Sequence, residues 1–546
     1  MKTVRSLEPC AASLASGYEN LPNVLEELGY DSLKPGQDQA VMNLMLKRDT
    51  ICVMPTGFGK SAIYIVPTRA VGWSTLIFSP LVSLMKDQVE SLWDKGYTAG
   101  QISSGQSVAE NNKVLEDWGM GELQFLLVAP ERLQNDKFLD VICSKKPDMV
   151  VIDEAHCISQ WAHSFRPDYL KIGEFVNSIC PDVVLALTAT LTEDMESDVR
   201  EALTISGAAK LVFYPERTNL QFEKYGYSVD ILRNLLTELT GPTIVYCSTR
   251  KRTQELYDMM KGTVDGGCLV YNGGMTPDER TTNQNLFMSN DVRVMFATNA
   301  FGMGVDKGDI RSVIHVDIPG SIEQYVQETG RAGRDGEDSR CIYLEDPKSL
   351  NTQMWFIETT YPEASIITSV WHRLKTMADR NGVVRATNIT LAKYLALDAA
   401  VIGSAKGVLI SYDIIDSKRS TQKTAKAKIL YEADPAKPDD VLELIVRYGF
   451  PVNDYYEFDL DFISEQKNVA VATIKTRLSK LHKNGNIIYI PPFRGNVVTI
   501  KKDITDLDFD ECAAKRATAR TKLQDLLRFL ELQSHQKHDY LTEYFK

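Results

Sequence analysis

The chain has 546 residues, a formal net charge of -12, and a composition that is 44% hydrophobic and 25% charged. This length is too great for one hydrophobic core and predicts several domains, while the composition excludes a disordered or fibrous protein. The acidic balance excludes a surface that is basic throughout, but not a local basic groove that binds nucleic acid. No apolar run reaches the roughly 18 residues of a membrane span, so we expect no membrane partner.

The nine cysteines are scattered, and the sequence contains no CxxC pair. Cys52, Cys247 and Cys341 lie inside apolar runs, where cysteine behaves as a small buried hydrophobic residue. We therefore expect an intracellular, reducing location and no zinc ribbon. Residues 1–20 lack the apolar core of a signal peptide, and we expect residues 1–24 to form a tail.

Residues 54–61 read MPTGFGKS and separate the apolar run 51–53 from the apolar run 62–66. Strand, glycine loop and helix in this order are typical of a phosphate-binding loop, where backbone N–H groups and the helix N-terminus face a triphosphate. Lys60 would reach the β- and γ-phosphates, and the Ser61 hydroxyl would bind Mg²⁺. Gln37, upstream of this loop, carries an amide that can both donate a hydrogen bond to an adenine edge and accept one from it. The predicted nucleotide-binding residues here are Gln37, Thr56, Gly57, Gly59, Lys60 and Ser61.

Four further apolar runs, separated by helical stretches, end in polar residues at 74–80, 125–132, 149–156 and 183–190. This pattern predicts a mostly parallel sheet with both faces covered, which binds ligands at the carboxyl ends of its strands. Asp153 and Glu154 come at one such end. Asp153 could hold Mg²⁺ and Glu154 could activate the attacking water, although such a pair alone is often a solvated loop or helix cap.

Residues 153–169, DEAHCISQWAHSFRPDY, resemble the RecQ family of DNA helicases, because they join a DEAH box to an aromatic-rich loop. Residues 29–37, 79–88, 129–133 and 188–190 are similar to other motifs of that family. The resemblance implies a superfamily 2 ATPase that moves 3′ to 5′ on single-stranded DNA and unwinds duplexes. It also implies two RecA-like lobes with ATP between them.

The sequence departs from the family pattern at four positions. Ala162 and Ser164 stand where the family has Gly and Asp, Lys34 replaces an arginine, and Phe58 replaces a glycine of the phosphate loop. Phe58, Ala162 and Ser164 leave open a DNA-binding scaffold with weak ATPase activity. An RNA helicase of the same superfamily is the nearer alternative.

Aromatic rings in the loop after the DEAH box can stack on bases, and arginine can contact phosphate. An alternative is that some of these rings only pack the edge of the sheet. His156 and His163 have no further ligand beside them, so we interpret them as polar couplers between the ATP and DNA sites rather than metal ligands. The predicted DNA-binding residues are Gln160, Trp161, Phe165, Arg166 and Tyr169.

Apolar runs at 243–250, 292–306 and 312–317 predict a second parallel sheet without its own phosphate loop. Residues 327–336, QETGRAGRDG, place two arginines about one helical turn apart. By resemblance, Arg334 is the arginine finger, Arg331 is a second catalytic arginine facing the phosphates, and Asp306 belongs to the nucleotide-binding set. Guanidinium groups can neutralise the charge that develops during phosphoryl transfer.

After about residue 343 the motifs stop, and 355–378 is predicted to be helical. The basic run 417–428 is either a solvated linker or a contact to the DNA backbone. Two helices and a hairpin between 458 and 500 predict a winged helix, with strands 487–490 and 496–500 joined by a wing tip at 493–495.

RecQ relatives usually carry four zinc-binding cysteines, but here only Cys512 follows Cys341, so we expect no zinc. The fold class is therefore predicted as α/β, with two RecA-like parallel-sheet lobes, a helical region and a winged-helix domain. The expected function is an ATP- and Mg²⁺-dependent 3′–5′ DNA helicase of repair or recombination that acts as a monomer on single strands and junctions. The expected parts are a tail at 1–24, lobes at 25–210 and 211–350, a helical or linker region at 351–435, the winged helix at 436–505, and a C-terminal helical segment at 506–546.

Overall fold

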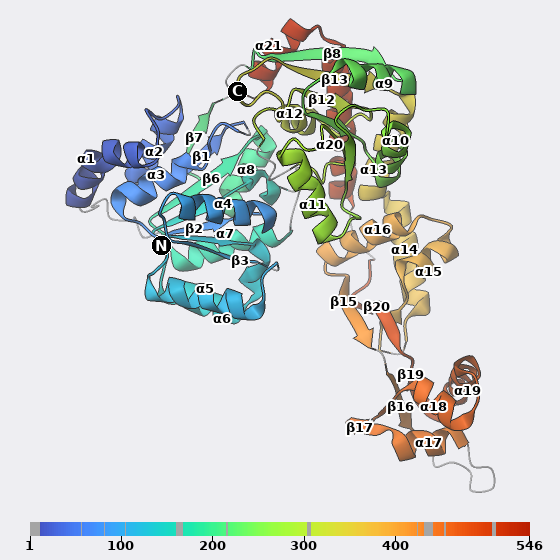
Figure 1. Ribbon diagram of the computed structural model, residues 1–546. Helices are drawn as coiled ribbons and strands as arrows, with labels where there is room; N and C mark the ends of the chain where they lie inside the picture. The colour runs from blue at the N-terminus through green and yellow to red at the C-terminus, as the bar shows by residue number, and fades with distance from the viewer. Residues whose placement is uncertain are drawn as a thin grey trace. The chain divides into compact units, whose positions relative to one another are not determined.

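The computed structural model describes residues 11–55, 57–80, 82–103, 105–159, 167–213, 217–302, 307–379, 381–422, 424–430, 440–452, 455–504 and 509–545. The chain divides into two compact units (Figure 1). The first unit joins Met1–Met354 to Thr518–Lys546, and the second is the intervening Trp355–Ala517. The first unit is therefore discontinuous in sequence, because its final helices are separated from the rest by the whole second unit.

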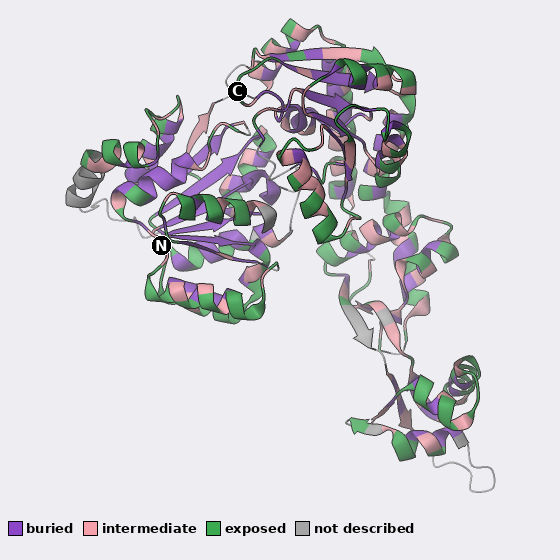
Figure 2. Cartoon of the chain, in the orientation of Figure 1, coloured by how far each residue is buried: buried purple, intermediate pink, exposed green. Residues whose placement is uncertain are grey.

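The first lobe is built on a seven-stranded parallel sheet in the order β3-β4-β2-β5-β6-β1-β7. Its central strands are fully buried, since helices cover both faces (Figure 2). Neighbouring residues of one strand point to opposite faces, so Ile51 and Cys52 of β1 belong to different hydrophobic cores. The strands are β1 (Thr50–Val53), β2 (Thr75–Phe78), β3 (Ala99–Ile102), β4 (Phe125–Val128), β5 (Met149–Ile152), β6 (Val183–Thr188) and β7 (Ala209–Val212).

Helices and short 3₁₀ turns connect these strands. α5 starts at a capping box in which Ser107 and Glu110 each bond the other's backbone N–H. The helical elements are α1 (Ala11–Glu27), α2 (Gln37–Met45), α3 (Ala62–Val71), α4 (Val82–Asp94), α5 (Val108–Met120), η1 (Pro130–Gln134), α6 (Asp136–Ser144), η2 (Ala155–Ile158), α7 (Pro167–Ile179) and α8 (Glu193–Ala202).

The second lobe is a six-stranded parallel sheet in the order β10-β11-β9-β12-β13-β8. Its strands are β8 (Leu220–Gly226), β9 (Thr243–Tyr246), β10 (Cys268–Tyr271), β11 (Val294–Ala297), β12 (Ser312–His315) and β13 (Ser339–Glu345). Its helices are α9 (Val229–Glu238), α10 (Arg250–Met260), α11 (Pro277–Met288) and α12 (Ile322–Thr329). The two predicted parallel-sheet lobes are thus confirmed.

Two helices from the end of the chain complete the second lobe. They are α20 (Asp510–Glu531) and α21 (Ser534–Tyr544), and α21 lies along the edge strand β8 (Figure 1). Phe529 is fully buried against the rings of Phe222 and Tyr325. The backbone N–H of Phe222 donates to Ser534 Oγ at 3.2 Å, so the helices also satisfy a group on the exposed edge of the sheet.

The second unit contains two small antiparallel sheets, and the sequence that forms one of them is inserted between two strands of the other. The three-stranded sheet β14-β20-β15 is interrupted between β15 and β20 by a module, residues 424–490, that holds the four-stranded sheet β17-β18-β16-β19. The strands are β14 (Val383–Arg385), β15 (Ile415–Gln422), β16 (Ala425–Ile429), β17 (Phe450–Val452), β18 (Tyr455–Phe458), β19 (Ile487–Ile490) and β20 (Phe493–Ile500). The helices are α13 (Pro347–Thr360), which starts in the first unit, α14 (Ala364–Met377), α15 (Asn388–Leu395), α16 (Ala399–Ser411), α17 (Asp440–Tyr448), α18 (Leu460–Lys467) and α19 (Val471–Lys483).

The basic run forms strands β15 and β16, so the linker alternative is wrong, while a contact to the DNA backbone stays a prediction. Within β16 Ala425 and Ala427 are buried, whereas Lys426 and Lys428 are half-buried on the other face. The predicted hairpin between 487–490 and 496–500 is absent, because β19 pairs with β16 whereas β20 pairs with β14 and β15. Pro491 and Pro492, which lack the N–H that a ladder needs, separate β19 from β20. The winged-helix interpretation of 436–505 stays a prediction without its predicted wing.

Within the described residues, no single helix is both long and apolar enough to cross a membrane, although α15 and α16, bent by 106° at their junction, pass that test together.

Candidate active site

The phosphate loop follows β1 and leads into α3, as the sequence predicts. Gly57 and Gly59 have φ angles of 79° and 85°, a conformation that side chains other than glycine's rarely adopt. Ser61 lies at the N-cap of α3, and its side chain makes no capping hydrogen bond. The loop thus turns sharply at two glycines and points the N-terminus of a ten-residue helix toward the carboxyl edge of the sheet.

Gln37, at the start of α2, is 4% exposed and braces this loop. Its amide nitrogen donates to the carbonyl oxygens of Phe58 and Gly59, both at 3.0 Å. Its carbonyl oxygen accepts from the Lys34 N–H at 2.9 Å. Both amide hydrogens are therefore used inside the protein, and one lone pair of Oε1 is left for a ligand.

Two departures from the family pattern lie together. The Lys34 ammonium is 5.2 Å from the centre of the Phe58 ring, which contacts the Phe213 ring at 5.0 Å between centres. These contacts, a cation–π pair and an aromatic pair, give the unusual phenylalanine of the loop a defined place. Phe58 therefore packs against one hydrophobic core of the first lobe, with Lys34 and Phe213 as its neighbours.

Asp153 and Glu154 follow β5, which is separated from β1 only by β6, and both are buried. Lys60 Nζ and Glu154 Oε2 are buried without a hydrogen-bond partner. Burial and the neighbouring Glu154 carboxylate raise the pKa of Asp153 to about 6. Burial acts to raise the pKa of Glu154 as well, but the charges of Lys60, His156 and Arg331 outweigh it and the pKa is lowered. Glu154 is thus held ionised at neutral pH beside a buried ammonium group.

The two predicted arginines come from the second lobe, just after α12. Arg334 lies over the phosphate loop, so close that a β-carbon on Gly57 would be 2.8 Å from Arg334 Cδ. Arg331 is 2% exposed, and its charge acts on Glu154. The structure therefore brings Gln37, Gly57, Gly59, Lys60, Ser61, Asp153, Glu154, Arg331 and Arg334 to one place.

A chain of polar contacts leads from Glu154 to the next strand. His156 Nδ1 is 3.3 Å from Glu154 Oε2 and 2.9 Å from Thr188 Oγ1. The Thr188 hydroxyl donates to the carbonyl oxygen of Thr190 at 2.9 Å and accepts from its N–H at 3.3 Å. Three successive contacts, from Glu154 to His156, from His156 to Thr188 and from Thr188 to Thr190, therefore connect the Glu154 carboxylate to the loop after β6.

Comparison with known proteins agrees with this geometry. Residues 34–197 match the DEAD/DEAH box helicase family, and residues 227–336 match the helicase conserved C-terminal domain. A probable ATP-dependent DNA helicase RecS of Bacillus subtilis is 38% identical over 65% of this chain and 72% of its own length. This chain belongs to the RecQ family.

The ATP-dependent DNA helicase RecQ of Bacillus subtilis is also 38% identical, over 61% of this chain, but the match spans just over half of that protein, 57%. Among solved structures, the DUF1998 helicase MrfA bound to DNA superposes with a TM-score of 0.51 at 19% identity, over 65% of this chain and 50% of that one. This likeness shows that the two chains share a fold over the superposed region.

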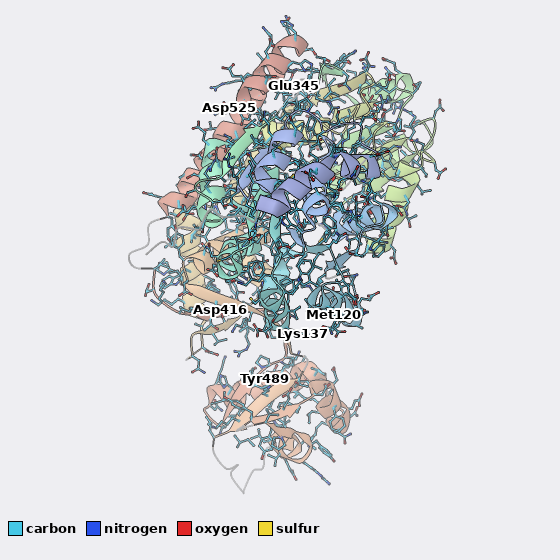
Figure 3. All side chains as sticks on the ribbon, turned by 90° about the vertical axis from the view of Figure 1, so that its left-hand side faces the viewer. Met120, Lys137, Glu345, Asp416, Tyr489 and Asp525 are labelled. Atoms are coloured by element: carbon cyan, nitrogen blue, oxygen red, sulfur yellow. The ribbon has the colours of Figure 1, made fainter. Side chains whose placement is uncertain are left out.

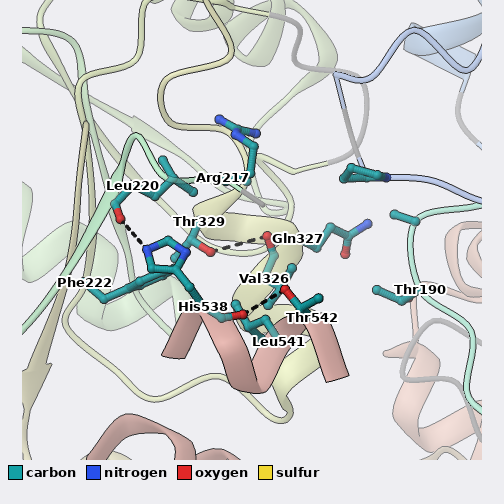
Figure 4. Close-up of a pocket in the computed structure, with 13 residues that line it drawn as sticks. Thr190, Arg217, Leu220, Phe222, Val326, Gln327, Thr329, His538, Leu541 and Thr542 are labelled. Atoms are coloured by element: carbon teal, nitrogen blue, oxygen red, sulfur yellow. Dashed lines mark hydrogen bonds between the residues drawn. The ribbon is translucent and has the colours of Figure 1, made fainter. Parts of the chain in front are cut away.

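A small pocket lies where the RecQ motifs of both lobes meet the C-terminal helix α21 (Figure 4). Thr190, at the end of the polar chain, contributes to it from the first lobe, and Gln327 contributes from α12. His538 of α21 closes another side, with Nε2 3.0 Å from the carbonyl oxygen of Leu220. The remaining lining residues are Pro55, Ala189, Arg217, Leu220, Phe222, Val326, Thr329, Gly330, Leu541 and Thr542.

α12, the helix that precedes Arg331 and Arg334, is held by contacts to the C-terminal helices that the sequence did not predict. Glu323, in the first turn of α12, is 8% exposed, and its Oε1 accepts from the Tyr544 hydroxyl at 3.2 Å. Lys522 Nζ of α20 is 3.2 Å from the same oxygen. These partners are about 200 positions away along the chain, so no local motif could have indicated the contact.

The predicted DNA-binding set is mostly outside the described residues, which exclude Gln160, Trp161, Phe165 and Arg166. Tyr169 is described and does not fit its predicted role. Its side chain is fully buried in the core of the first lobe, and its hydroxyl donates to the backbone carbonyl of Asp153 at 3.1 Å. A ring in this position supports the DEAH turn and has no surface for a base to stack on.

Thr56, Asp306 and His163 also lie outside the described residues. Across the described part of the chain, no group of three or more His, Cys, Asp or Glu side chains is arranged to hold a metal ion. The predicted absence of zinc stays a prediction.

Proposed function

We propose that this RecQ-family protein hydrolyses ATP at the described site and uses the energy to move 3′ to 5′ along single-stranded DNA, unwinding duplexes at junctions. The observation that carries the proposal is the buried Lys60 Nζ, which has no hydrogen-bond partner and lies at the end of a glycine loop that Arg334 covers. A buried ammonium group without a hydrogen-bond partner is unfavourable unless a ligand completes it. Nucleoside triphosphate with Mg²⁺ fits these residues in charge and in donor type.

Bound Mg²⁺–ATP would supply the phosphoryl bond that is broken. Lys60 would neutralise the β- and γ-phosphates, while the loop amides after Gly57 and Gly59 would donate to the phosphate oxygens. Ser61 Oγ and the Asp153 carboxylate would hold the metal ion. A divalent cation favours ionised Asp153, which burial and Glu154 otherwise disfavour.

Glu154 would orient the attacking water and take its proton at Oε2. Its lowered pKa supports this role, since an ionised carboxylate is the form that accepts a proton. Arg334 and Arg331 would stabilise the negative charge that builds on the transferred group. Gln37 would hold the phosphate loop in its conformation through its two amide hydrogen bonds. Its Oε1 would also accept a hydrogen bond from adenine with the remaining lone pair.

ATP hydrolysis would be coupled to movement on DNA by the polar chain that starts at Glu154. This chain passes through His156 and Thr188 and ends at Thr190. Loss of the γ-phosphate changes the charge beside Glu154, and the contacts carry that change to the pocket where Gln327 of the second lobe lies. We further propose that the protein acts as an intracellular monomer on single strands and single-strand–double-strand junctions in repair or recombination.

The test measures ATP hydrolysis by the full chain without nucleic acid, with single-stranded DNA and with single-stranded RNA, each with and without a Mg²⁺ chelator. Glu154→Gln should reduce the DNA-stimulated rate at least about a thousandfold, because the proton acceptor is lost while the volume is kept. Glu174→Gln, on the exposed side of α7, is the matched control and should keep the wild-type rate. Stimulation by RNA alone would replace this proposal with an RNA helicase, and a rate indifferent to both would favour a DNA-binding scaffold.

A further inference from the structure

The chain passes from the first lobe to the second between β7 and β8, and two described residues of this connection contact the candidate active site. Phe213, directly after β7, packs its ring against Phe58 of the phosphate loop. Arg217, three residues before β8, contacts the loop between α12 and β13, which carries both predicted catalytic arginines. This loop, residues 330–338, is called the arginine loop below. The connection between the lobes therefore contacts both the phosphate loop and the arginine loop.

The Arg217 guanidinium group binds the backbone of the arginine loop. Its Nη2 donates to the carbonyl oxygen of Ala332 at 2.6 Å and to that of Gly333 at 2.8 Å. Because Nη2 carries two hydrogens, one nitrogen can serve both carbonyl groups. Ala332 and Gly333 are buried, so removal of Arg217 would take a charged donor from two oxygens inside the protein. These two peptide groups lie between Arg331 and Arg334, and their orientation sets the direction in which the two side chains leave the backbone.

Asn219 holds the same turn from a second position. Its Nδ2 donates to the carbonyl oxygens of Gly333 and Glu337, both at 2.9 Å, and its Oδ1 accepts from Arg217 Nε at 3.4 Å. Gly333 has a φ of 56°, and a β-carbon there would be 2.5 Å from Asn219 Nδ2. The arginine loop can therefore approach Asn219 this closely only because position 333 is a glycine.

The strands that follow Asn219 and the arginine loop fix these two segments beside each other. β8 and β13 pair in parallel along their whole length, and Glu345, labelled in Figure 3, marks the far end of the pair. At the near end, the Asn219 carbonyl oxygen accepts from the Ser339 N–H at 2.9 Å. Arg217 thus acts on the arginine loop from a segment whose own position is set by the sheet.

We propose that Arg217 is a positioning residue for ATP hydrolysis, which holds the arginine loop so that Arg334 lies over the phosphate loop. This inference rests on the proposed function, because it assumes that the site hydrolyses ATP. Misplacing a group in an active site by about 1 Å can cost roughly a hundredfold in rate. Because Arg217 belongs to the connection between the lobes, the place of Arg334 depends on that connection as well as on α12.

The experiment compares Arg217→Ala with Arg293→Ala in the full chain. Arg293, just before β11, also donates to backbone carbonyl oxygens, including those of Asp265 at 2.7 Å and Leu236 at 2.6 Å. Neither of these acceptors belongs to the candidate active site. Both arginines are half-buried in the second lobe, so the two variants lose similar contacts and should show similarly lowered melting temperatures. The kinetic measurements are the kcat and the KM for ATP in the presence of single-stranded DNA.

Arg217→Ala should lower kcat at least about tenfold while the KM for ATP changes less than about threefold, whereas Arg293→Ala should keep both constants. Arg217→Lys should recover part of the lost rate, because a single ammonium nitrogen can also donate to both carbonyl groups. Equal kcat values for Arg217→Ala and Arg293→Ala would overturn the proposal, since the loss would then follow from destabilisation of the lobe.

A double-mutant cycle with Arg334 distinguishes positioning from a direct contact between Arg217 and the nucleotide. If Arg217 acts through Arg334, adding Arg217→Ala to Arg334→Ala should change the single-turnover rate less than about threefold. An equally large loss in both backgrounds would show that Arg217 acts without Arg334 and would overturn the proposal.

The wild-type rate separates this inference from the proposed function. A wild-type protein that does not hydrolyse ATP would contradict the proposed function and this inference together. An active wild-type protein whose kcat is unaffected by Arg217→Ala would contradict this inference alone.

Discussion

Arg334 of the second lobe lies against Gly57 of the first, and a β-carbon on Gly57 would be 2.8 Å from Arg334 Cδ and 3.0 Å from its Nε. The glycine is therefore required for two reasons, its φ of 79° and the closeness of the arginine. The phosphate loop and the predicted arginine finger are therefore in close contact at Gly57.

Gly57→Ala tests this fit. The added methyl group should displace Arg334 and lower the kcat of ATP hydrolysis at least about tenfold, because the arginine would no longer reach the transferred phosphoryl group. Gly72→Ala is the matched control, since Gly72 has a similar φ of 76° but a β-carbon there would meet no atom within 4 Å. The control should cost about 1 kcal/mol of stability and keep its rate. Equal kinetic effects in the two variants would assign the loss to backbone strain rather than to Arg334.

The polar chain from the DEAH turn to the loop after β6 leads to a second prediction. Thr188→Val keeps the side-chain shape but removes the hydroxyl shared by His156 and Thr190, leaving buried groups unpaired at a cost of about 1–3 kcal/mol. We expect basal ATP hydrolysis to persist and its stimulation by single-stranded DNA to fall about tenfold, as Thr188 positions rather than reacts.

Thr50→Val serves as its control, because Thr50 is equally buried in the neighbouring strand and its hydroxyl donates to the carbonyl of Arg48 at the opposite end of the sheet. The measurement is the ratio of rates with and without DNA. Identical ratios for Thr188→Val and Thr50→Val would show that the polar chain does not couple the two activities.

The fastening of α12 by the C-terminal helices leads to a third prediction. Tyr544→Phe removes a hydrogen bond to the buried carboxylate of Glu323 and should destabilise the first unit by about 1–2 kcal/mol. Because α12 leads directly to Arg331 and Arg334, kcat should fall while the KM for ATP changes little. Tyr540→Phe, on the same helix, is the control, and equal melting temperatures for the two variants would remove Glu323 from this role.

The pH dependence of the contact between Glu323 and Lys522 leads to a fourth prediction. Burial acts to raise the pKa of Glu323, but Lys522, Ser321 and a backbone amide outweigh it, so the folded pKa lies below the usual 4.5. The contact therefore contributes stability that is fully present above the unfolded pKa and is lost as the pH falls through the folded value. Glu323→Gln should lower the melting temperature more at about pH 7 than near pH 3.5. A difference from wild type that is constant over this range would contradict the assignment.

The sequence predicted the central strands well because buried parallel strands are continuous apolar runs, as in β5 and β6. It missed the edge strands β3, β7, β8 and β10, of which β3, β7 and β8 contain polar residues or glycine. An edge strand is paired on one side only, and its composition is correspondingly mixed. The lysine-alanine alternation of β16 was misread for a similar reason, since its buried residues are only alanines.

The candidate active site was predicted more completely than the fold around it. Lys60, Glu154 and Arg334, which the structure brings together, belong to motifs whose spacing is local, so the sequence displays them directly, while their roles stay predictions. Tyr169 was misplaced because an aromatic ring near a DNA-contacting loop can equally support the turn from below, and only burial distinguishes the two. The contact between Glu323 and Tyr544 joins residues 221 positions apart and could be seen only in the fold.

The inserted module leaves and re-enters its host sheet at a single point. Gln422, the last residue of β15, is the register partner of Phe493, the first residue of β20. The module therefore occupies the place of a loop between two paired strands, and the pairing of β15 with β20 holds its two ends together. The module is therefore an insertion that evolution could lengthen, replace or delete at one point of the host sheet. Such a change would alter what the second unit binds, while the two parallel-sheet lobes would keep their sequence and their contacts.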